Sequence, residues 1–353
     1  MRILVASDAF KDACSSIVAS NAIAQGILRF DKTIEIVVCP ISDGGEGTIE
    51  ILRHHLSGKL VTVETCDPLF RKVNANYLQL DQSTAVIETA QACGLELLSD
   101  HERNPMNTTT FGIGLLIKNA LDHGNRKIIL TIGGSSTNDF GVGMACGLGV
   151  QFHDLRGNPV APIGGYLRNI VRIDRTNLDN RIRDCEFSVL TDVQNPLFGK
   201  NGAAHIFAKQ KGASDTEILL LDQGLKNMAK LVETNVSDTA GSGAAGGLGA
   251  GCIAFLDASL RSGIDTIMDM INMDDLIANA DLIITGEGHL DEQTMGGKVI
   301  QGILDRAQIM NKPVLVVCGK CNHDIDKNRS MGIERVWVIL VYVTMTVREM
   351  LKN

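Results

Sequence analysis

The 353-residue sequence has few aromatic residues, few prolines and no surplus of basic charge. Phe, Trp and Tyr make up 4% of the chain, and there are 7 prolines. The 41 acidic side chains outnumber the 33 Lys and Arg, which gives a formal net charge of -8. We therefore expect no nucleic-acid partner, because no basic excess is present to displace phosphate counterions.

Long apolar runs are also lacking, and the one C-x-x-C pair, Cys318 and Cys321, has no second pair beside it to complete a zinc site. The longest apolar run, Val336 to Val343, is too short to span a bilayer, so no membrane partner is expected. The first residues, MRILVASDAF, begin directly as a strand-like run without the apolar core of a signal peptide. The 9 cysteines are otherwise scattered singly, which fits a reducing cytoplasm better than a disulfide framework. These absences predict a cytoplasmic protein.

Several catalytic motifs are absent from the sequence. There is no Walker P-loop, no paired zinc-ligand spacing and no G-x-S-x-G nucleophile elbow. The segment from Gly241 to Gly246 matches G-x-G-x-x-G, but residues 234–240 before it do not have a strand pattern. A Rossmann-type oxidoreductase is therefore an alternative that a helix or loop before these glycines would eliminate.

What the sequence does contain is an alternation of short apolar runs and helical patterns. The runs typical of buried parallel strands are Ile3–Ala6, Ile34–Cys39, Lys127–Ile132, Phe187–Leu190, Leu282–Thr285 and Pro313–Cys318. Helical patterns cover Ser15–Phe30, Thr109–His123 and Asp215–Val232, the first with Ile17, Ala24, Ile27 and Leu28 on one side. This alternation predicts a doubly wound α/β fold with a parallel sheet.

The segment Leu60–Glu88 has a different pattern. Three β-rich stretches, VTVET, VNANYLQL and TAVIE, are separated by turn residues, which is typical of an antiparallel meander. We expect this meander to mark the start of a second domain inserted in the first.

The stretch Thr131–Gly149 reads TIGGSSTNDFGVGMACGLG and follows a predicted strand. A strand, a glycine turn and a helix start form a geometry that points backbone N–H groups at an anion. The alternative is a tight connection in which Ser or Thr only caps the helix. The motif alone leaves both interpretations open.

Five predicted strands are followed by acidic or basic side chains near glycine. These residues are Asp8 and Lys11, Asp43 and Glu46, Asn138 and Asp139, Asp192 with Asn195 and Lys200, and Glu287 with Asp291. The carboxyl ends of parallel strands share one edge, so we expect the five loops to converge on one crevice. Carboxylates beside glycine turns suit a magnesium–phosphate site. Each acid alone is also explained as a helix cap or turn former.

The order of these motifs resembles that of the bacterial glycerate kinases of the glycerate 2-kinase family. The matching segments are SDAFKD, SDGGEGT, IGGSSTND, TDVQNPLFG, GAAHIFAKQKGA, GSGAAGGLGAG and TGEGHLDEQT followed by GGK. The resemblance runs from Met1 to about Glu334, and the motifs are specific jointly rather than singly.

The resemblance implies transfer of the γ-phosphoryl group of ATP to D-glycerate, with Mg²⁺. The product would be 2-phospho-D-glycerate, with 3-phosphoglycerate as the alternative. It also implies a Rossmann-like, doubly wound parallel sheet domain from residues 1–60 and 282–353. A second α/β domain, residues 61–281, would be inserted in it, and the active site would lie in the cleft.

Roles for individual residues follow as hypotheses. Asp192 is the first choice for the base that accepts the hydroxyl proton, and Lys11 would meet the transferring phosphoryl group or the substrate carboxylate. Candidates for holding Mg²⁺ are Asp8, Asp43 and Asp291. Candidates for binding substrate or phosphate are Gly133, Gly134, Ser135, Ser136, Asn138, Asn195, Gly243, Gly246, Gly247 and Glu287. The residues leave open which acid binds metal and which accepts the proton.

The sequence departs from the family pattern in several places. Phe140 stands where a glycine usually follows the Asn-Asp pair, and Leu115 replaces a usual glutamate. After Val343 only the residues TMTVREMLKN follow, where the family continues through another loop into a long helix. We expect the exposed apolar face to lower stability, at roughly 1.5–3 kcal/mol for each large side chain, or to be covered by a homodimer. An impaired family member that binds nucleotide or hydroxy acid is therefore the main alternative.

Overall fold

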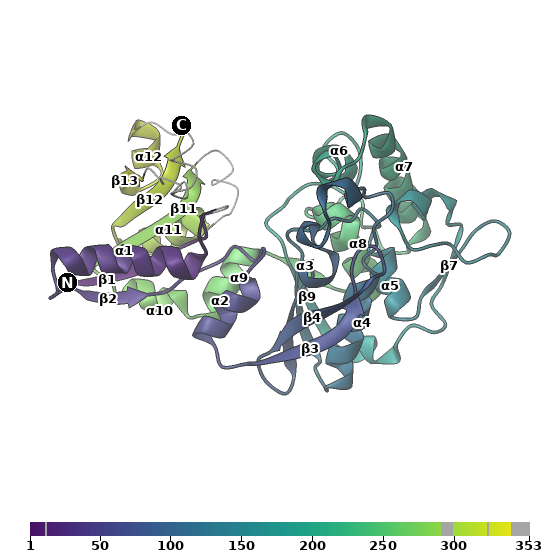
Figure 1. The fold of residues 1–353 in the computed structure, drawn as a ribbon, viewed down its shortest axis with the longest axis horizontal. Helices are drawn as coiled ribbons and strands as arrows, with labels where there is room; N and C mark the ends of the chain where they lie inside the picture. The colour runs from purple at the N-terminus through teal and green to yellow at the C-terminus, as the bar shows by residue number, and fades with distance from the viewer. Residues whose placement is uncertain (11–12, 291–298, 323–324, 340–353) are drawn as a thin grey trace, which may run out of the picture. The chain divides into compact units, whose positions relative to one another are not determined.

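The computed structural model describes residues 1–10, 13–290, 299–322 and 325–339. These residues form two compact units, coloured along the chain in Figure 1. The first contains residues 1–43 and the described residues from 264 onward, and the second is Gly44–Gly263. The chain thus divides after Asp43 and after Gly263, whereas the boundaries that we expect for the domains, after residue 60 and before residue 282, stay a prediction.

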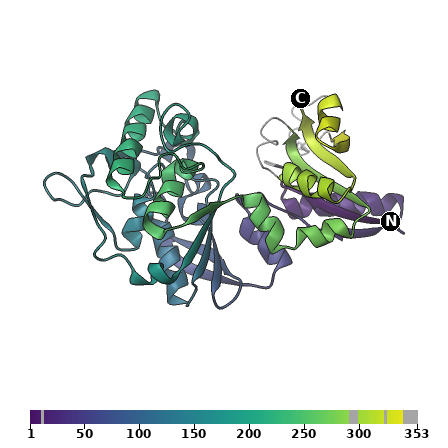
Figure 2. The same cartoon turned by 180° about the vertical axis from the view of Figure 1, so that it is seen from behind.

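The first unit is a parallel sheet with the strand order β13-β12-β11-β1-β2. Its strands are β1 (Arg2–Ser7), β2 (Glu35–Val38), β11 (Leu282–Leu290), β12 (Val314–Cys321) and β13 (Ile333–Val338). Its helices are α1 (Ser16–Phe30), α9 (Gly263–Met270), α10 (Met273–Ala278), α11 (Val299–Ile309) and α12 (Ile325–Ser330), of which α9 begins at the unit boundary. The two opposite views show α1 on one face of the sheet and α11 on the other (Figures 1 and 2). The predicted doubly wound α/β fold is confirmed.

The buried face of α1 agrees only in part with the expected one, because Ala24 is buried and Ile27 packs against the core, whereas Leu28 is exposed. Leu28 is 38% exposed. The residues that α1 buries are Ser16, Ala19, Ser20 and Ala24. Two of these are serines because they bond the end of β1: the Ser16 hydroxyl donates to the Ser7 carbonyl at 2.7 Å, and the Ser20 hydroxyl accepts from the Ser7 N–H at 3.3 Å. Hydrogen bonds to the strand therefore orient this helix together with the apolar contacts of Ala19, Ile23 and Ile27.

The second unit contains a mixed sheet with the strand order β10-β9-β6-β5-β4-β3. Its strands are β3 (Lys59–Cys66), β4 (Lys72–Gln79), β5 (Thr84–Glu88), β6 (Lys127–Thr131), β9 (Glu186–Leu190) and β10 (Ser259–Arg261). The first three strands pair antiparallel, which confirms the predicted meander, and β5, β6, β9 and β10 pair parallel. A separate antiparallel pair is formed by β7 (Gln151–His153) and β8 (Arg172–Asp174).

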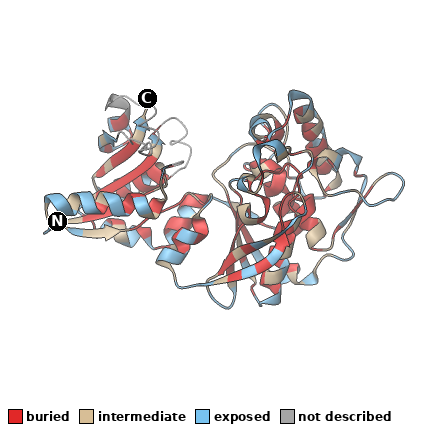
Figure 3. Cartoon of the chain, in the orientation of Figure 1, coloured by how far each residue is buried: buried red, intermediate tan, exposed pale blue. Residues whose placement is uncertain are grey.

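Helices of the second unit build two adjoining cores. Its α-helices are α2 (Thr48–His55), α3 (Ala90–Cys93), α4 (Phe111–Asp122), α5 (Val142–Gly147), α6 (Ala203–Phe207), α7 (Asp215–Leu231) and α8 (Ala244–Leu256). Its 3₁₀ helices are η1 (Leu95–Leu97), η2 (Asp100–Glu102), η3 (Gly164–Asn169), η4 (Asn180–Asp184) and η5 (Lys209–Lys211). One core packs α4 and α8 on the sheet, and the other surrounds Phe140, Leu221 and Phe255. Figure 3 shows buried residues following the central strands of both sheets.

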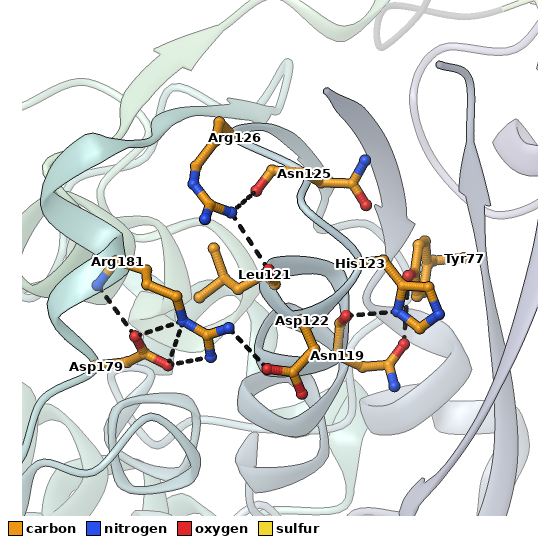
Figure 4. Close-up of polar contacts among 9 residues, drawn as sticks. All are labelled: Tyr77, Asn119, Leu121, Asp122, His123, Asn125, Arg126, Asp179 and Arg181. Atoms are coloured by element: carbon orange, nitrogen blue, oxygen red, sulfur yellow. Dashed lines mark hydrogen bonds and ion pairs between the residues drawn. The ribbon is translucent and has the colours of Figure 1, made fainter. Parts of the chain in front are cut away.

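A polar network closes the connection from α4 to β6 (Figure 4). Arg181 pairs with Asp179 at 2.6 Å and with Asp122 at 2.7 Å. Arg126 donates to the carbonyl of Leu121 at 3.3 Å. These bonds hold the amino end of β6, so they lie at the opposite end of this strand from the glycine turn at residues 133–134.

The expectation that five loops share the edge of one parallel sheet is wrong. Asp8 and Asp43 follow strands of the first sheet and Glu287 lies within its strand β11. Asn138 and Asp192 instead follow β6 and β9 of the second sheet. Strand runs in sequence do not reveal which of two parallel sheets each strand joins.

No helix in the described part of the chain has the length and apolar character needed to span a membrane. All 9 cysteines carry free thiols.

Candidate active site

Three of the motif segments meet within the second unit. They are the loop after β6, the loop after β9 and the glycine-rich turn that leads into α8. A Cβ atom on Gly246 would overlap the carbonyl oxygen of Thr137, and one on Gly243 would overlap the carbonyl oxygen of Pro196. The Gly243 N–H also donates to the Asn195 carbonyl at 3.1 Å. The turn therefore joins both loops, and only glycine allows backbone to approach so closely at these two positions.

The backbone of this turn is left-handed over three consecutive residues. Ala245, Gly246 and Gly247 have φ values of 53°, 70° and 86°. The Gly246 carbonyl, freed from a normal helical bond, accepts the N–H of Phe140 at 3.3 Å. The glycines of this turn that we expect to bind phosphate are Gly243, Gly246 and Gly247, and all three are buried. In the structure they allow the loops to pack closely.

Phe140 occupies a backbone conformation that favours glycine. Its φ is 58°, which costs a residue with a side chain about 1–2 kcal/mol. Its ring is fully buried and meets the ring of Phe255 edge to face, with 6.3 Å between centroids. Glycine would adopt this backbone without strain, whereas in this chain the aromatic ring is buried against Phe255.

The Asp139 carboxylate has a structural role. It is fully buried and accepts hydrogen bonds from the N–H and the hydroxyl of Thr110, both at 2.8 Å. It also accepts from the N–H groups of Gly141 and Gly143 at 3.1 Å. Burial raises the pKa of Asp139, and these hydrogen bonds oppose that rise. The carboxylate ties the start of α5 to the residue before α4.

The loop after β6 exposes its glycines and turns its hydroxyl groups inward. Gly134 is exposed and Gly133 half-buried, whereas Ser135 and Ser136 are buried. The Ser136 hydroxyl donates to the carbonyl of Cys93 at 2.9 Å. The accessible groups of this loop are therefore backbone groups at residues 133–134, as an anion site requires.

The side chain of Asn138 is 1% exposed. Neither its amide nitrogen nor its amide oxygen has a hydrogen-bond partner within the described residues. A buried amide without partners costs about 1–3 kcal/mol, so this group is expected to bind water or a ligand.

The second glycine segment of the site, Gly44 to Gly47, approaches the loop after β6. A Cβ on Gly133 would lie 2.9 Å from the Cα of Gly45, and one on Gly134 would lie 3.9 Å from Oε2 of Glu46. A pocket of about 180 Å³ lies here, lined among others by Glu46, Glu88, Gln91 and Gly134. Glu88 accepts from the Gly47 N–H at 2.8 Å and so fixes the start of α2.

Asp192 lies half-buried at the carboxyl end of β9. Its Oδ1 accepts from the N–H of Gly263, the first residue of α9, at 2.9 Å and from the Ser262 hydroxyl at 3.2 Å. In the same loop, the amide of Asn195 donates to the carbonyl of Asn201 at 2.9 Å. Asp192 therefore positions the chain before α9 whatever further role it has.

The acids of the first unit gather at the carboxyl edge of its sheet. The Asp8 N–H donates to the Gly286 carbonyl at 2.8 Å, which places Asp8 beside the buried Glu287. The Ile41 N–H donates to the Ser7 carbonyl at 3.3 Å, so the segment before Asp43 runs past the same strand end. No group of three or more His, Cys, Asp or Glu positioned for a metal occurs among the described residues. Lys11 and Asp291 lie outside the described residues.

One residue of the site was missed by the reasoning from motifs and spacing. Lys211, in η5, is 3% exposed, and its ammonium donates to the Ser135 hydroxyl and to the Thr137 carbonyl, both at 2.8 Å. Burial lowers the pKa of Lys211 to about 8. Its segment, AKQKGA, is part of the family resemblance, but a lysine in such a polar stretch is normally expected on the surface.

The oxidoreductase alternative is eliminated. Residues 234–240, which precede the Gly241–Gly246 motif, form turns and irregular chain, and a dinucleotide-binding turn requires a strand there.

Comparison with known proteins agrees with this arrangement. A family model described as the glycerate kinase family matches residues 3–353. The chain is 41% identical to a glycerate kinase of Bacillus cereus, over 96% of this chain and 90% of that protein. It is 40% identical to a glycerate 2-kinase of Escherichia coli, over 97% and 91%. A crystal structure described as glycerate kinase 2 from Salmonella typhimurium LT2 matches with a TM-score of 0.82 and 40% identity, over 96% and 90%.

The two α/β units and their glycine-rich loops at strand ends are thus those of a kinase, for which ATP is the co-substrate. The chain belongs to the glycerate kinase family.

Proposed function

We propose that this protein transfers the γ-phosphoryl group of ATP to the 2-hydroxyl of D-glycerate, giving 2-phospho-D-glycerate. The Escherichia coli relative named glycerate 2-kinase supports this choice of hydroxyl. The structural observation that carries the proposal is the joining of two loops by the turn at Gly243 and Gly246. The turn thereby links the loop that contains the exposed Gly134 to the loop that contains the half-buried Asp192. Each of these loops follows a parallel strand.

In this proposal Asp192 accepts the proton of the glycerate hydroxyl. Phosphoryl transfer depends mainly on positioning the nucleophile and stabilising charge, and a carboxylate near the hydroxyl does the first. The hydrogen bonds from Ser262 and Gly263 hold Oδ1 in place. Asn195, whose amide is fixed by the Asn201 carbonyl, would help to orient the substrate.

The backbone N–H groups at Gly133 and Gly134 would bind an anionic group of the substrates, because they are the accessible part of their loop. The buried members of the predicted set have supporting roles in this proposal. Ser135, Ser136 and the glycines of the 243–247 turn would hold the loop in place, and Asn138 would bind water or ligand with its unpartnered amide.

Mg²⁺ usually binds to proteins through one or two carboxylates together with substrate phosphates. Asp8 and Asp43 fit that requirement, because both follow strands at one edge of the first sheet and Glu287 lies in the neighbouring strand β11. The ion would supply positive charge that neutralises the transferred group. Asp291 as a third metal ligand, and Lys11 as a partner of the phosphoryl group or substrate carboxylate, remain part of this proposal.

The test is ADP release by the full chain with D-glycerate, with and without Mg²⁺, against a control without glycerate. The proposal predicts ADP release that requires both glycerate and Mg²⁺. The alternative is an impaired member that binds without turnover, which the strained backbone of Phe140 favours. Calorimetric binding of ATP or D-glycerate without ADP release would establish that alternative and reject the kinase.

Two broader expectations also remain proposals. The 9 free thiols support a reducing compartment such as the cytoplasm. A homodimer would cover apolar surface at the end of β13, where Trp337, Val338 and Ile339 are 41%, 56% and 42% exposed. Sedimentation velocity tests the dimer, and a single species at the monomer mass across micromolar concentrations would reject it.

A further inference from the structure

The ammonium group of Lys211 is buried without a carboxylate partner. Its hydrogen bonds go to the Ser135 hydroxyl and the Thr137 carbonyl, and no acid in the described part of the chain lies within ion-pair distance. Burying a charged group without an ion-pair partner costs several kcal/mol. Packing alone does not explain why a lysine, rather than an apolar residue, is buried next to the loop that contains Gly133 and Gly134.

The other ionisable groups near Lys211 do not pair with it directly. Cys93, at the end of α3, has a thiol whose pKa is raised to about 12 by burial, so this thiol is neutral near pH 8. Asp139 is the nearby acid, and its two oxygens are occupied by four donors from Thr110, Gly141 and Gly143. The positive charge of Lys211 therefore acts mainly on the loop that it bonds.

We infer that Lys211 is a positioning residue for anion binding at Gly133 and Gly134. Its two hydrogen bonds hold Ser135 and Thr137 from inside, so that the preceding glycines present their N–H groups outward. Its charge adds a positive potential to this site, which favours a phosphate or a carboxylate. The inference rests on the proposed function, because it assigns Lys211 to the same substrate site.

Substitution Lys211→Met removes the charge and both hydrogen bonds but keeps a long apolar side chain. We expect the KM for one anionic substrate to rise about tenfold, as for a lost hydrogen bond to a charged group, while kcat falls less. Separate titrations of ATP and D-glycerate show whether the anion is a phosphate or the carboxylate. Lys209→Met is the matched control, because Lys209 lies two residues away with a side chain that is 76% exposed. It should keep both KM values.

The pH profile separates this role from packing alone. The wild-type kcat/KM for that substrate should fall as pH rises through about 8, because Lys211 loses its proton there. Lys211→Met should lack this decline. Equal KM values in a folded Lys211→Met protein, together with an unchanged decline above pH 8, would overturn the inference.

A second variant covers the case in which Lys211→Met does not fold. Ser135→Ala removes one acceptor of Lys211 and leaves the Thr137 carbonyl, so a smaller rise in the same KM is expected. An unchanged KM in folded Ser135→Ala would also overturn the inference. Absence of ADP release by the wild type would instead reject the proposed function. Calorimetric titration with ATP and with D-glycerate then compares the substrate affinity of the wild type with that of the variants. Equal affinities, or no binding by any of these proteins, would reject the role inferred for Lys211.

Discussion

Gly246 packs against Thr137 so closely that a Cβ on the glycine would overlap the threonine carbonyl oxygen. This contact joins the turn before α8 to the loop after β6. The neighbouring contact of Gly243 with Pro196 joins the same turn to the loop after β9. Two loops that are about sixty residues apart in the sequence therefore pack on one turn, and substitutions in the turn should affect both loops.

Gly246→Ala should be strongly destabilising. The residue has a φ of 70°, and the added methyl would have to displace the backbone of Thr137 and Asn138. Strain and overlap together should lower the free energy of unfolding by about 3 kcal/mol or more. Urea denaturation measures this change. Gly157→Ala is the control, because its φ is 80° but nothing lies within 4 Å of a Cβ. It should cost about 1 kcal/mol, and equal losses at both sites would show that overlap does not matter.

The strain at Phe140 can be tested by comparing the stabilities of its glycine and alanine variants, because glycine should be the more stable of the two at this position. Both substitutions open a cavity where the ring packs on Phe255, so both should lower stability by about 3–5 kcal/mol. Because φ is 58°, Phe140→Gly should be more stable than Phe140→Ala by about 1 kcal/mol.

The control pair is at Phe152, whose ring also meets that of Phe255 but whose residue lies in the strand β7. There Phe152→Gly should be less stable than Phe152→Ala, because glycine weakens a strand. The same order of glycine and alanine at both sites, by thermal or urea unfolding, would contradict the claim that the backbone at Phe140 is strained.

Asp192→Asn and Asp192→Ala separate the proposed base from its structural role. The asparagine oxygen still accepts from Gly263 and Ser262, so the fold should be retained while kcat falls by about 10²–10⁴-fold. Alanine also removes these bonds and should lower the free energy of unfolding by about 1 kcal/mol. Steady-state kinetics with unfolding curves measures both effects. Near-native turnover of Asp192→Asn would remove Asp192 as the base.

Arg181→Gln should change stability without changing substrate binding, because Arg181 supports the amino end of β6. The hydrogen bond from Arg181 lowers the pKa of Asp179 below its usual range. A carboxylate with a lowered pKa stabilises the fold above the unfolded pKa of about 3.9, and this contribution is lost as pH falls through the folded value. The side chain of Arg181 is 34% exposed, so the expected loss at pH 7 is only about 1 kcal/mol.

Unfolding curves for Arg181→Gln and the wild type between pH 7 and pH 2 provide the measurement. The difference in stability between the two proteins should shrink toward the acid end. A constant difference across this range, or a changed KM, would contradict the role given to Arg181.

The strands and the meander were predictable because apolar runs and turn residues act locally. The glycine that the family resemblance leads one to expect at position 140 agrees with the left-handed backbone there, where Phe140 has a φ of 58°. The buried face of α1 was predictable only in part, because two of its residues are serines that are buried through hydrogen bonds to β1. Lys211 was missed for a similar reason, since its burial depends on acceptors in a loop far away in the sequence. Hydrogen bonds between segments that are far apart in the chain produce no periodic pattern of residues in the sequence.

Phosphorus NMR of the reaction product tests the central claim most directly. The full chain is incubated with ATP, Mg²⁺ and D-glycerate, and the new phosphomonoester signal is recorded with proton coupling. We expect a doublet in amount equal to the ADP formed, because phosphate on the 2-hydroxyl couples to the single proton of C2. A triplet, from phosphate on the 3-hydroxyl, would contradict the 2-phospho-D-glycerate product, and the absence of any new phosphomonoester would contradict the kinase itself.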